Sequence, residues 1–158
     1  MTGSPMPEQA PSTTGVVPRL WRKRAHRGVL DEVSELRLVE GEGIEDGVDR
    51  GGSRQVTFLS EEAWEDTVRE LGTEVDPSAR RANVLVRGLS LEDSRGKILE
   101  IGPCTIEIRG ETRPCERMDE ASPGLQAALR PAWRGGAYGR VLTGGTLLPG
   151  AEVRLRTP

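Results

Sequence analysis

The chain has 158 residues, enough for one hydrophobic core and too few for two domains of ordinary size, so a single domain is expected. Its formal net charge is -3, and its 22 basic and 25 acidic side chains are interspersed, which disfavours binding to a nucleic acid. No apolar run approaches the roughly 18 residues that cross a bilayer, and no signal-peptide pattern opens the chain, so we expect a cytoplasmic protein without membrane contact.

Two cysteines and one histidine cannot complete the usual four-ligand zinc site, so structural zinc is not expected. Aromatic residues make up 3% of the chain and 20 residues are glycine, a balance that favours short strands joined by tight turns over a helical bundle. The composition therefore predicts a mainly β fold. The many short strands and few helices found along the chain further predict a closed or partly closed β-barrel with two or three short helices.

The chain opens with a segment that has little to bury. Residues 1–15 hold three prolines and are expected to form a disordered tail, which leaves a single domain over 16–158. A first strand is predicted at 33–39, with Leu36 and Leu38 on one face, and a second at 55–59. The Gly-rich, acidic stretch 41–52 between them is expected to be a loop.

The strongest helix signal follows the second strand. Ser60 can cap a helix that Gly72 ends, and Trp64, Val68 and Leu71 recur at helical spacing along one face. The remaining predicted elements are a helical turn at 76–78, strands at 83–87, 98–101 and 105–109, a helix from Ser122 to near Pro131, and strands at 138–142, 146–148 and 151–156.

Gly110 and Glu111 predict a hairpin turn that would place residue 106 opposite residue 115. On that register Cys104 and Cys115 are diagonal neighbours, and a disulfide between them would need a slipped register.

Cys115 is the first candidate for chemistry, because Pro114 fixes the backbone before it and Arg113 and Arg117 flank it. Positive neighbours favour the thiolate, the form that sulfur transfer or a soft metal requires. The alternative is that Cys115 is a small buried hydrophobic residue. Cys104 has no charged neighbour close by and is expected to be structural.

Several blocks of the sequence together form a family pattern. They are 54–59, 81–89, Ile101-Gly102, Arg113-Pro114-Cys115, 134–142, Gly144-Gly145 and 149–153. In this order they resemble MOSC domains, which occur at the C-terminus of molybdenum-cofactor sulfurases, in association with pyridoxal-phosphate enzymes, and as free-standing bacterial proteins. The likeness runs from about residue 20 to residue 156.

The resemblance implies a β-barrel-like fold with one functional cysteine, at the position of Cys115. In the family this cysteine is thought to carry sulfur or to meet molybdenum cofactor, and in amidoxime-reducing members it is a molybdenum ligand. Cys115 is therefore the residue predicted for both catalysis and metal binding, and molybdenum cofactor is the implied cofactor.

The predicted cofactor-binding residues are mostly cations. Arg81, Arg113 and Arg140 lie in three matching blocks and are expected to converge on the anionic pterin phosphate, since guanidinium groups bind phosphate bidentately. Lys23 and Arg24 correspond to basic residues that hold the cofactor's phosphate in the reducing members. A solvated run of charge is the alternative for these two.

Three further residues leave alternatives open. Asn83 opens a predicted strand and either orders a loop or faces a ligand. The loop at 43–50 departs from the family's Gly-Leu-x-Gly-Asp, so Asp46 or Asp49, or neither, takes the family's aspartate role. His26 is the only histidine, and without a Gly-x-Ser-x-Gly elbow it does not support serine-type hydrolysis.

The leading hypothesis is a stand-alone domain that binds molybdenum cofactor or carries sulfur on Cys115, with reduction of N-hydroxylated compounds as one outcome. Electrons or sulfur would come from a separate donor protein, because the chain has no flavin, haem or iron-sulfur motif. The alternative is a non-catalytic module that recognises a partner or relays sulfur. A third alternative is that the protein resembles the family and has lost its activity.

Overall fold

The computed structural model describes residues 13–25, 28–48 and 51–158. Its strands are β1 (Thr14–Lys23), β2 (Leu30–Val33), β3 (Leu36–Val39), β4 (Gly43–Ile44), β5 (Val56–Ser60), β6 (Val84–Arg87), β7 (Ile98–Ile101), β8 (Cys104–Glu111), β9 (Ala137–Thr143), β10 (Gly145–Leu147) and β11 (Glu152–Arg156). Its helices are α1 (Glu61–Leu71), α2 (Met118–Ala121) and α3 (Leu125–Leu129), with 3₁₀ turns η1 (Pro77–Arg80) and η2 (Pro131–Trp133).

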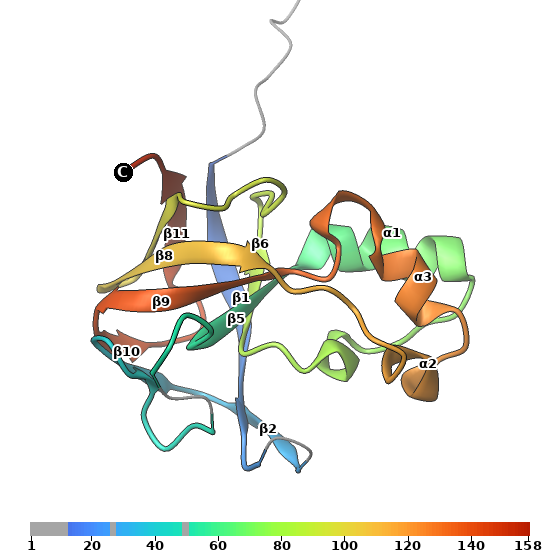
Figure 1. Cartoon of the computed structure of the whole chain (residues 1–158), viewed down its shortest axis with the longest axis horizontal. Helices are drawn as coiled ribbons and strands as arrows, with labels where there is room; N and C mark the ends of the chain where they lie inside the picture. Colours follow the sequence, from blue (N-terminus) through green and yellow to red (C-terminus); the bar gives the residue numbers. More distant parts are fainter. Residues whose placement is uncertain (1–12, 26–27, 49–50) are drawn as a thin grey trace, which may run out of the picture.

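Seven of these strands form a closed barrel in the order β11-β7-β8-β9-β5-β6-β1, and β1 pairs with β11 to close it (Figure 1). The pairing joins Thr14 to Arg154 and Gly15 to Val153. The backbone groups along the edges of the first and last strands are therefore paired with each other. Neighbouring strands are antiparallel except β5 and β6, which are parallel and are connected through α1. The fold class expected from the sequence, a mainly β barrel with short helices, is confirmed.

The barrel core is built by alternation along its strands. In β8, Cys104, Ile106 and Ile108 are buried, and the residues between them are more exposed. A second, three-stranded sheet in the order β10-β3-β4 packs Leu36 and Leu147 into the same core.

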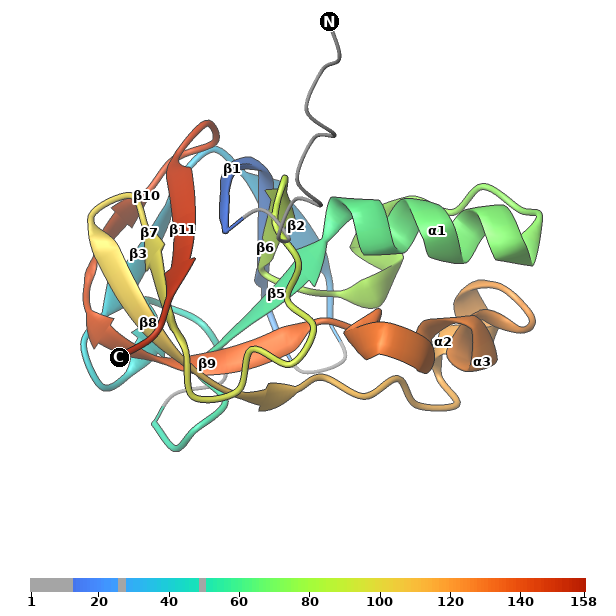
Figure 2. The ribbon, with the colours of Figure 1, turned by 90° about the horizontal axis from the view of Figure 1, so that it is seen from above.

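The helices lie together beside the barrel, and Figure 2 shows α1, α2 and α3 extending from one side of it. They enclose a second core that includes Trp64, Met118, Leu125 and Leu129. Helix α1 begins and ends as predicted: the Ser60 hydroxyl accepts a hydrogen bond from the Ala63 amide, and the helix ends at Gly72, whose φ is 74°. Among the described helices, none is long and apolar enough to cross a membrane.

Two predictions near the start of the chain need correction. The single strand expected at 33–39 is two strands, because Ser34 and Glu35 separate β2, which pairs with β1, from β3, which belongs to the small sheet. Strand β1 itself was not predicted, and it brings Thr14 and Gly15 into the barrel instead of the expected tail. The rest of that tail, residues 1–12, lies outside the described residues.

The predicted hairpin at Gly110 is wrong. Strand β8 continues to Glu111 and pairs with β9, so Ile106 lies opposite Val141 and not opposite residue 115. The reason is the ring of Tyr138: a Cβ atom on residue 110 would lie 2.7 Å from the Tyr138 hydroxyl oxygen, so glycine here permits close packing and not a turn.

Candidate functional site

Cys115 lies in the loop between β8 and α2, where its thiol is free and exposed. Its carbonyl accepts a hydrogen bond of 3.0 Å from the Met118 amide at the start of α2. Cys104 is buried in the barrel core, and this burial raises the pKa of its thiol to about 11. The structure thus places the two cysteines in opposite environments, and the buried alternative for Cys115 is excluded.

The guanidinium of Arg80 contacts the backbone of the loop that carries Cys115. Arg80 is 9% exposed, and its Nε donates a hydrogen bond of 2.8 Å to the Gly135 carbonyl before β9. Its Nη2 donates to the carbonyls of Thr112, at 2.9 Å, and Arg113, at 3.4 Å, and its Nη1 lies 3.9 Å from Met118 Sδ. One buried side chain therefore joins two segments that are distant in the sequence.

Arg80 is a buried cation without an acidic partner among the described residues, since the acceptors of its hydrogen bonds are backbone carbonyls and a thioether. Burial lowers the pKa of Arg80 to about 10, and repulsion from Arg54 acts in the same direction, while attraction to Cys115 opposes it. The group remains charged at neutral pH, so this region carries positive charge in a poorly solvated place.

Two glycines allow this close packing. A Cβ atom on Gly135 would collide with the Thr112 carbonyl oxygen, and one on Gly136 would collide with the Phe58 carbonyl oxygen. The φ of Gly136 is 102°, in the region that favours glycine.

A small basic cavity of about 30 Å³ lies beside Arg80. Its wall is formed by Lys23, Arg54, Thr57, Arg80, Arg81, Ala82, Thr112 and Gly135. Four of these residues are cations, and no acidic residue of the described chain lines the cavity.

Two residues of the cavity wall each have a buried polar atom without a hydrogen-bond partner among the described residues: Arg81 Nη2 and Thr112 Oγ1. Thr112 is 3% exposed. Buried polar groups are ordinarily paired, because an unpaired one loses its hydration without replacement. A guanidinium nitrogen and a hydroxyl can both donate hydrogen bonds, and an anion is the acceptor that suits them.

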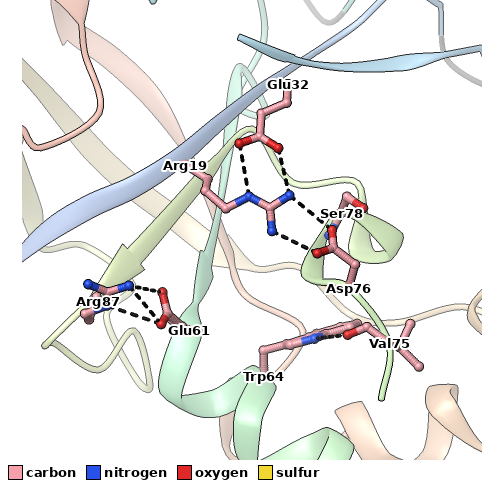
Figure 3. A network of polar contacts seen from close by, with 8 residues as sticks. All are labelled: Arg19, Glu32, Glu61, Trp64, Val75, Asp76, Ser78 and Arg87. Carbon is pink, nitrogen blue, oxygen red and sulfur yellow. Dashed lines mark hydrogen bonds and ion pairs between the residues drawn. The ribbon is translucent and has the colours of Figure 1, made fainter. Parts of the chain in front are cut away.

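The turn that presents the two arginines is braced by a polar network (Figure 3). Arg19 on β1 donates to both oxygens of Glu32 and, at 2.9 and 3.2 Å, to those of Asp76. Asp76 in turn caps η1 by accepting from the Ser78 amide at 3.1 Å. The Arg19 hydrogen bonds hold the pKa of Asp76 at about 2, below its usual range.

The turn ends at Arg81, whose φ of 64° is in the left-handed region that non-glycine residues seldom adopt. Arg80 and Arg81 are therefore adjacent in sequence, line the same cavity, and make different contacts.

The predicted cofactor-binding cations do not all lie at this cavity. Lys23 and Arg81 line it, whereas Arg24 pairs with Asp31 at 2.7 Å with its side chain 66% exposed, as in a solvated run of charge. Arg113 is 85% exposed and 3.9 Å from Glu111.

Arg140 lies on a different surface, in a hollow with Glu40 and Glu107, because β9 directs Gly139 and Val141 inward and Arg140 outward. The expected convergence of Arg81, Arg113 and Arg140 is thus not found.

Asn83 is buried and paired within the protein. Its Oδ1 accepts from the amide and the hydroxyl of Thr57, each at 3.0 Å, and its Nδ2 donates to the Trp21 carbonyl at 3.4 Å. These bonds join β1 and β5, which matches the structural alternative for Asn83. Asp46 is exposed, and Asp49 and His26 lie outside the described residues.

Sequence reasoning missed Arg54, Arg80 and Thr112. Arg80 directly precedes Arg81, which was singled out because it opens a block of the family likeness, and nothing was inferred from the pair. The other two residues are brought to the cavity by β5 and β8, which approach it from distant parts of the chain.

Comparisons with known proteins place this geometry in a family. The model of the MOSC domain family matches residues 24–154, and a search of the curated proteins found no match. Among solved structures, the YuaD protein from Bacillus subtilis superposes with a TM-score of 0.79 at 20% identity, over 92% of this chain and 97% of that one.

YiiM from Escherichia coli has a TM-score of 0.66 at 20% identity, over 90% of this chain and 70% of that one. YiiM from Geobacillus stearothermophilus has a TM-score of 0.63 at 20% identity, over 89% and 72%. At these identities the likeness establishes the shared fold, and the family model covers most of the sequence. The chain belongs to the MOSC domain family.

Proposed function

We propose that this MOSC domain binds an anionic, phosphate-bearing cofactor, molybdenum cofactor, in the basic cavity, and that Cys115 is its reactive thiol. The observation that carries the proposal is that two residues of a cavity lined by cations have buried polar atoms without a partner among the described residues, Arg81 Nη2 and Thr112 Oγ1. An anion bound there would satisfy both atoms and offset the buried charge of Arg80.

The residues present fit the charged end of such a group. The cavity of about 30 Å³ is far smaller than a cofactor-sized pocket, so it takes oxygen atoms of an anion rather than a whole cofactor. Arg81, Thr112, Lys23 and Arg54 would hold the anion. Bound molybdenum would supply the redox chemistry, for which N-hydroxylated compounds are one substrate class.

A thiolate is a ligand suited to a soft metal, which is the role proposed for Cys115. No group of three or more His, Cys, Asp or Glu residues that could hold a metal ion occurs in the described part of the chain. Further ligands to molybdenum would therefore come from the cofactor, and electrons from a separate donor protein.

Sulfur carriage is the second candidate function, and the exposure of Cys115 on a loop favours it because a donor protein can reach the thiol. The Cys115 thiolate would attack the outer sulfur of a persulfide on the donor. The sulfur-sulfur bond of the donor breaks, its thiolate leaves, and the new persulfide is on Cys115.

Metal and sulfur analysis of wild type, Cys115→Ser and Cys104→Ala, purified from a host that makes molybdenum cofactor, tests both functions. Molybdenum near one equivalent in wild type and Cys104→Ala, and its loss in Cys115→Ser, is the result expected for a metal ligand. Cyanide-labile sulfur that is lost only in Cys115→Ser indicates sulfur carriage. If wild type contains neither molybdenum nor cyanide-labile sulfur, both proposed functions are contradicted and a recognition module remains.

A further inference from the structure

Arg80 ends η1 and Arg81 follows it directly, and these two adjacent arginines have different roles. We infer that Arg80 is a positioning residue, whose guanidinium holds the loop that carries Cys115 against the start of β9, while Arg81 is left to bind the ligand. The inference rests on the proposed function in taking Cys115 as the reactive group and Arg81 as a ligand-binding residue.

The exposure of the loop shows why it needs such a support. From Arg113 to Arg117 the side chains are exposed or half-buried, whereas Thr112 before them and Met118 after them are buried. Arg80 contacts both of these flanking residues, through the Thr112 carbonyl and Met118 Sδ. A single guanidinium therefore fixes both ends of the segment that presents Cys115.

The contacts of Arg80 use the shape of its guanidinium as well as its charge. All three nitrogens donate, in different directions, and Nη2 serves two successive carbonyls. A lysine ammonium is a compact point charge and cannot span Gly135, Thr112 and Met118 together. Charge alone therefore cannot replace Arg80.

Arg81 offers a matched control because it ends the same turn, carries the same charge and lines the same cavity. Its Nη2 has no hydrogen-bond partner among the described residues, whereas each nitrogen of Arg80 has at least one. Replacing Arg81 removes a cation from the cavity and leaves the contacts of the Cys115 loop in place.

Hydrogen exchange of the full chain, followed by mass spectrometry, measures how often the hydrogen bonds of the loop open. It is compared in wild type, Arg80→Lys, Arg80→Met and Arg81→Met. The amides to follow are those of Thr112, which donates to the Gly136 carbonyl, and Met118, which donates to the Cys115 carbonyl. Both Arg80 variants should speed their exchange by about tenfold or more, with β7 and β11 unchanged, and Arg81→Met should match wild type. Exchange at the wild-type rate in Arg80→Lys would overturn the inference.

Alkylation of Cys115 supplies a readout that a purely structural role would not move. Iodoacetate is an anion and iodoacetamide is neutral, so the ratio of their rates reports the positive charge around the thiol at low salt. Wild type should favour iodoacetate several-fold more than a short cysteine peptide does. Arg80→Lys should lose this preference although the net charge is unchanged, because the loop moves away from the cavity.

If Arg80→Lys keeps the wild-type ratio, Arg80 does not position the thiol. Should both Arg80 variants fail to fold, as judged by circular dichroism, wild type alone still decides: no protection at Thr112 and Met118, or no preference for iodoacetate, contradicts the inference. Neither readout involves molybdenum, persulfide or phosphate, so a failure of the proposed function is distinguishable from a failure here.

Discussion

At the scale of single residues, the environment of each cysteine decides its role. Cys104 is packed among aliphatic side chains, where the neutral thiol is favoured, while Cys115 is exposed beside buried positive charge. A proline precedes both cysteines, and the sequence distinguished them by charge, since Arg113 and Arg117 flank Cys115 and no charged residue flanks Cys104 closely. The structure adds Arg80, whose contacts to the Cys115 loop and to Gly135 no local pattern reveals.

Thr112 gives a prediction at the same scale. Its buried hydroxyl has no hydrogen-bond partner among the described residues, so Thr112→Val should leave the free energy of unfolding unchanged or raise it by about 1 kcal/mol, in urea titrations without ligand. Thr67→Val is the matched control, since the equally buried Thr67 hydroxyl donates to the Ala63 carbonyl at 2.7 Å and its loss should cost about 1 kcal/mol. A loss at Thr112 as large as that at Thr67 would show that its hydroxyl is paired.

At the scale of elements, the sequence predicted those whose signals are local. Helix α1 has its cap, its apolar face and its final glycine within one short stretch, and it forms as expected. Strand β1 was missed because Pro18 interrupts it, and the structure accommodates this proline where the register between β1 and β6 shifts. The hairpin at Gly110 was mistaken because the packing of Tyr138 on that glycine joins two strands far apart in sequence.

The brace on η1 makes stability depend on pH. Hydrogen bonds from Arg19 lower the pKa of Asp76 to about 2, so the folded state favours the carboxylate. This contribution is present above the ordinary pKa of about 3.9 and is lost as pH falls toward about 2.

Asp76→Asn should therefore lower stability at neutral pH and remove part of the fall in stability that wild type shows between about pH 4 and pH 2. Urea titrations across this range measure the difference. Arg19→Met removes the same hydrogen bonds and should flatten the profile in the same way. A profile for Asp76→Asn that runs parallel to wild type would mean that the brace contributes nothing.

At the scale of the whole molecule, the site lies where the barrel and the helical lobe meet. Arg80 ends a turn between α1 and β6, Thr112 leaves the barrel strand β8, and Met118 belongs to the core of the helices. The many short strands in the sequence predicted a closed or partly closed barrel, because closure removes the free edges of a sheet. The four cations of the cavity come from three chain segments that the closed barrel brings together, so Lys23 and Arg81 were found by resemblance and Arg54 by structure alone.

Binding of inorganic phosphate, measured by isothermal titration at low salt, tests the anion cavity most directly. Wild type should bind phosphate, and Arg81→Met should weaken binding by about tenfold or more, because a charge-assisted hydrogen bond is lost. Arg24→Met, which removes an exposed cation outside the cavity, should leave the affinity near that of wild type. Equal affinities of wild type and Arg81→Met, or no phosphate binding by wild type, would contradict an anionic ligand in this cavity.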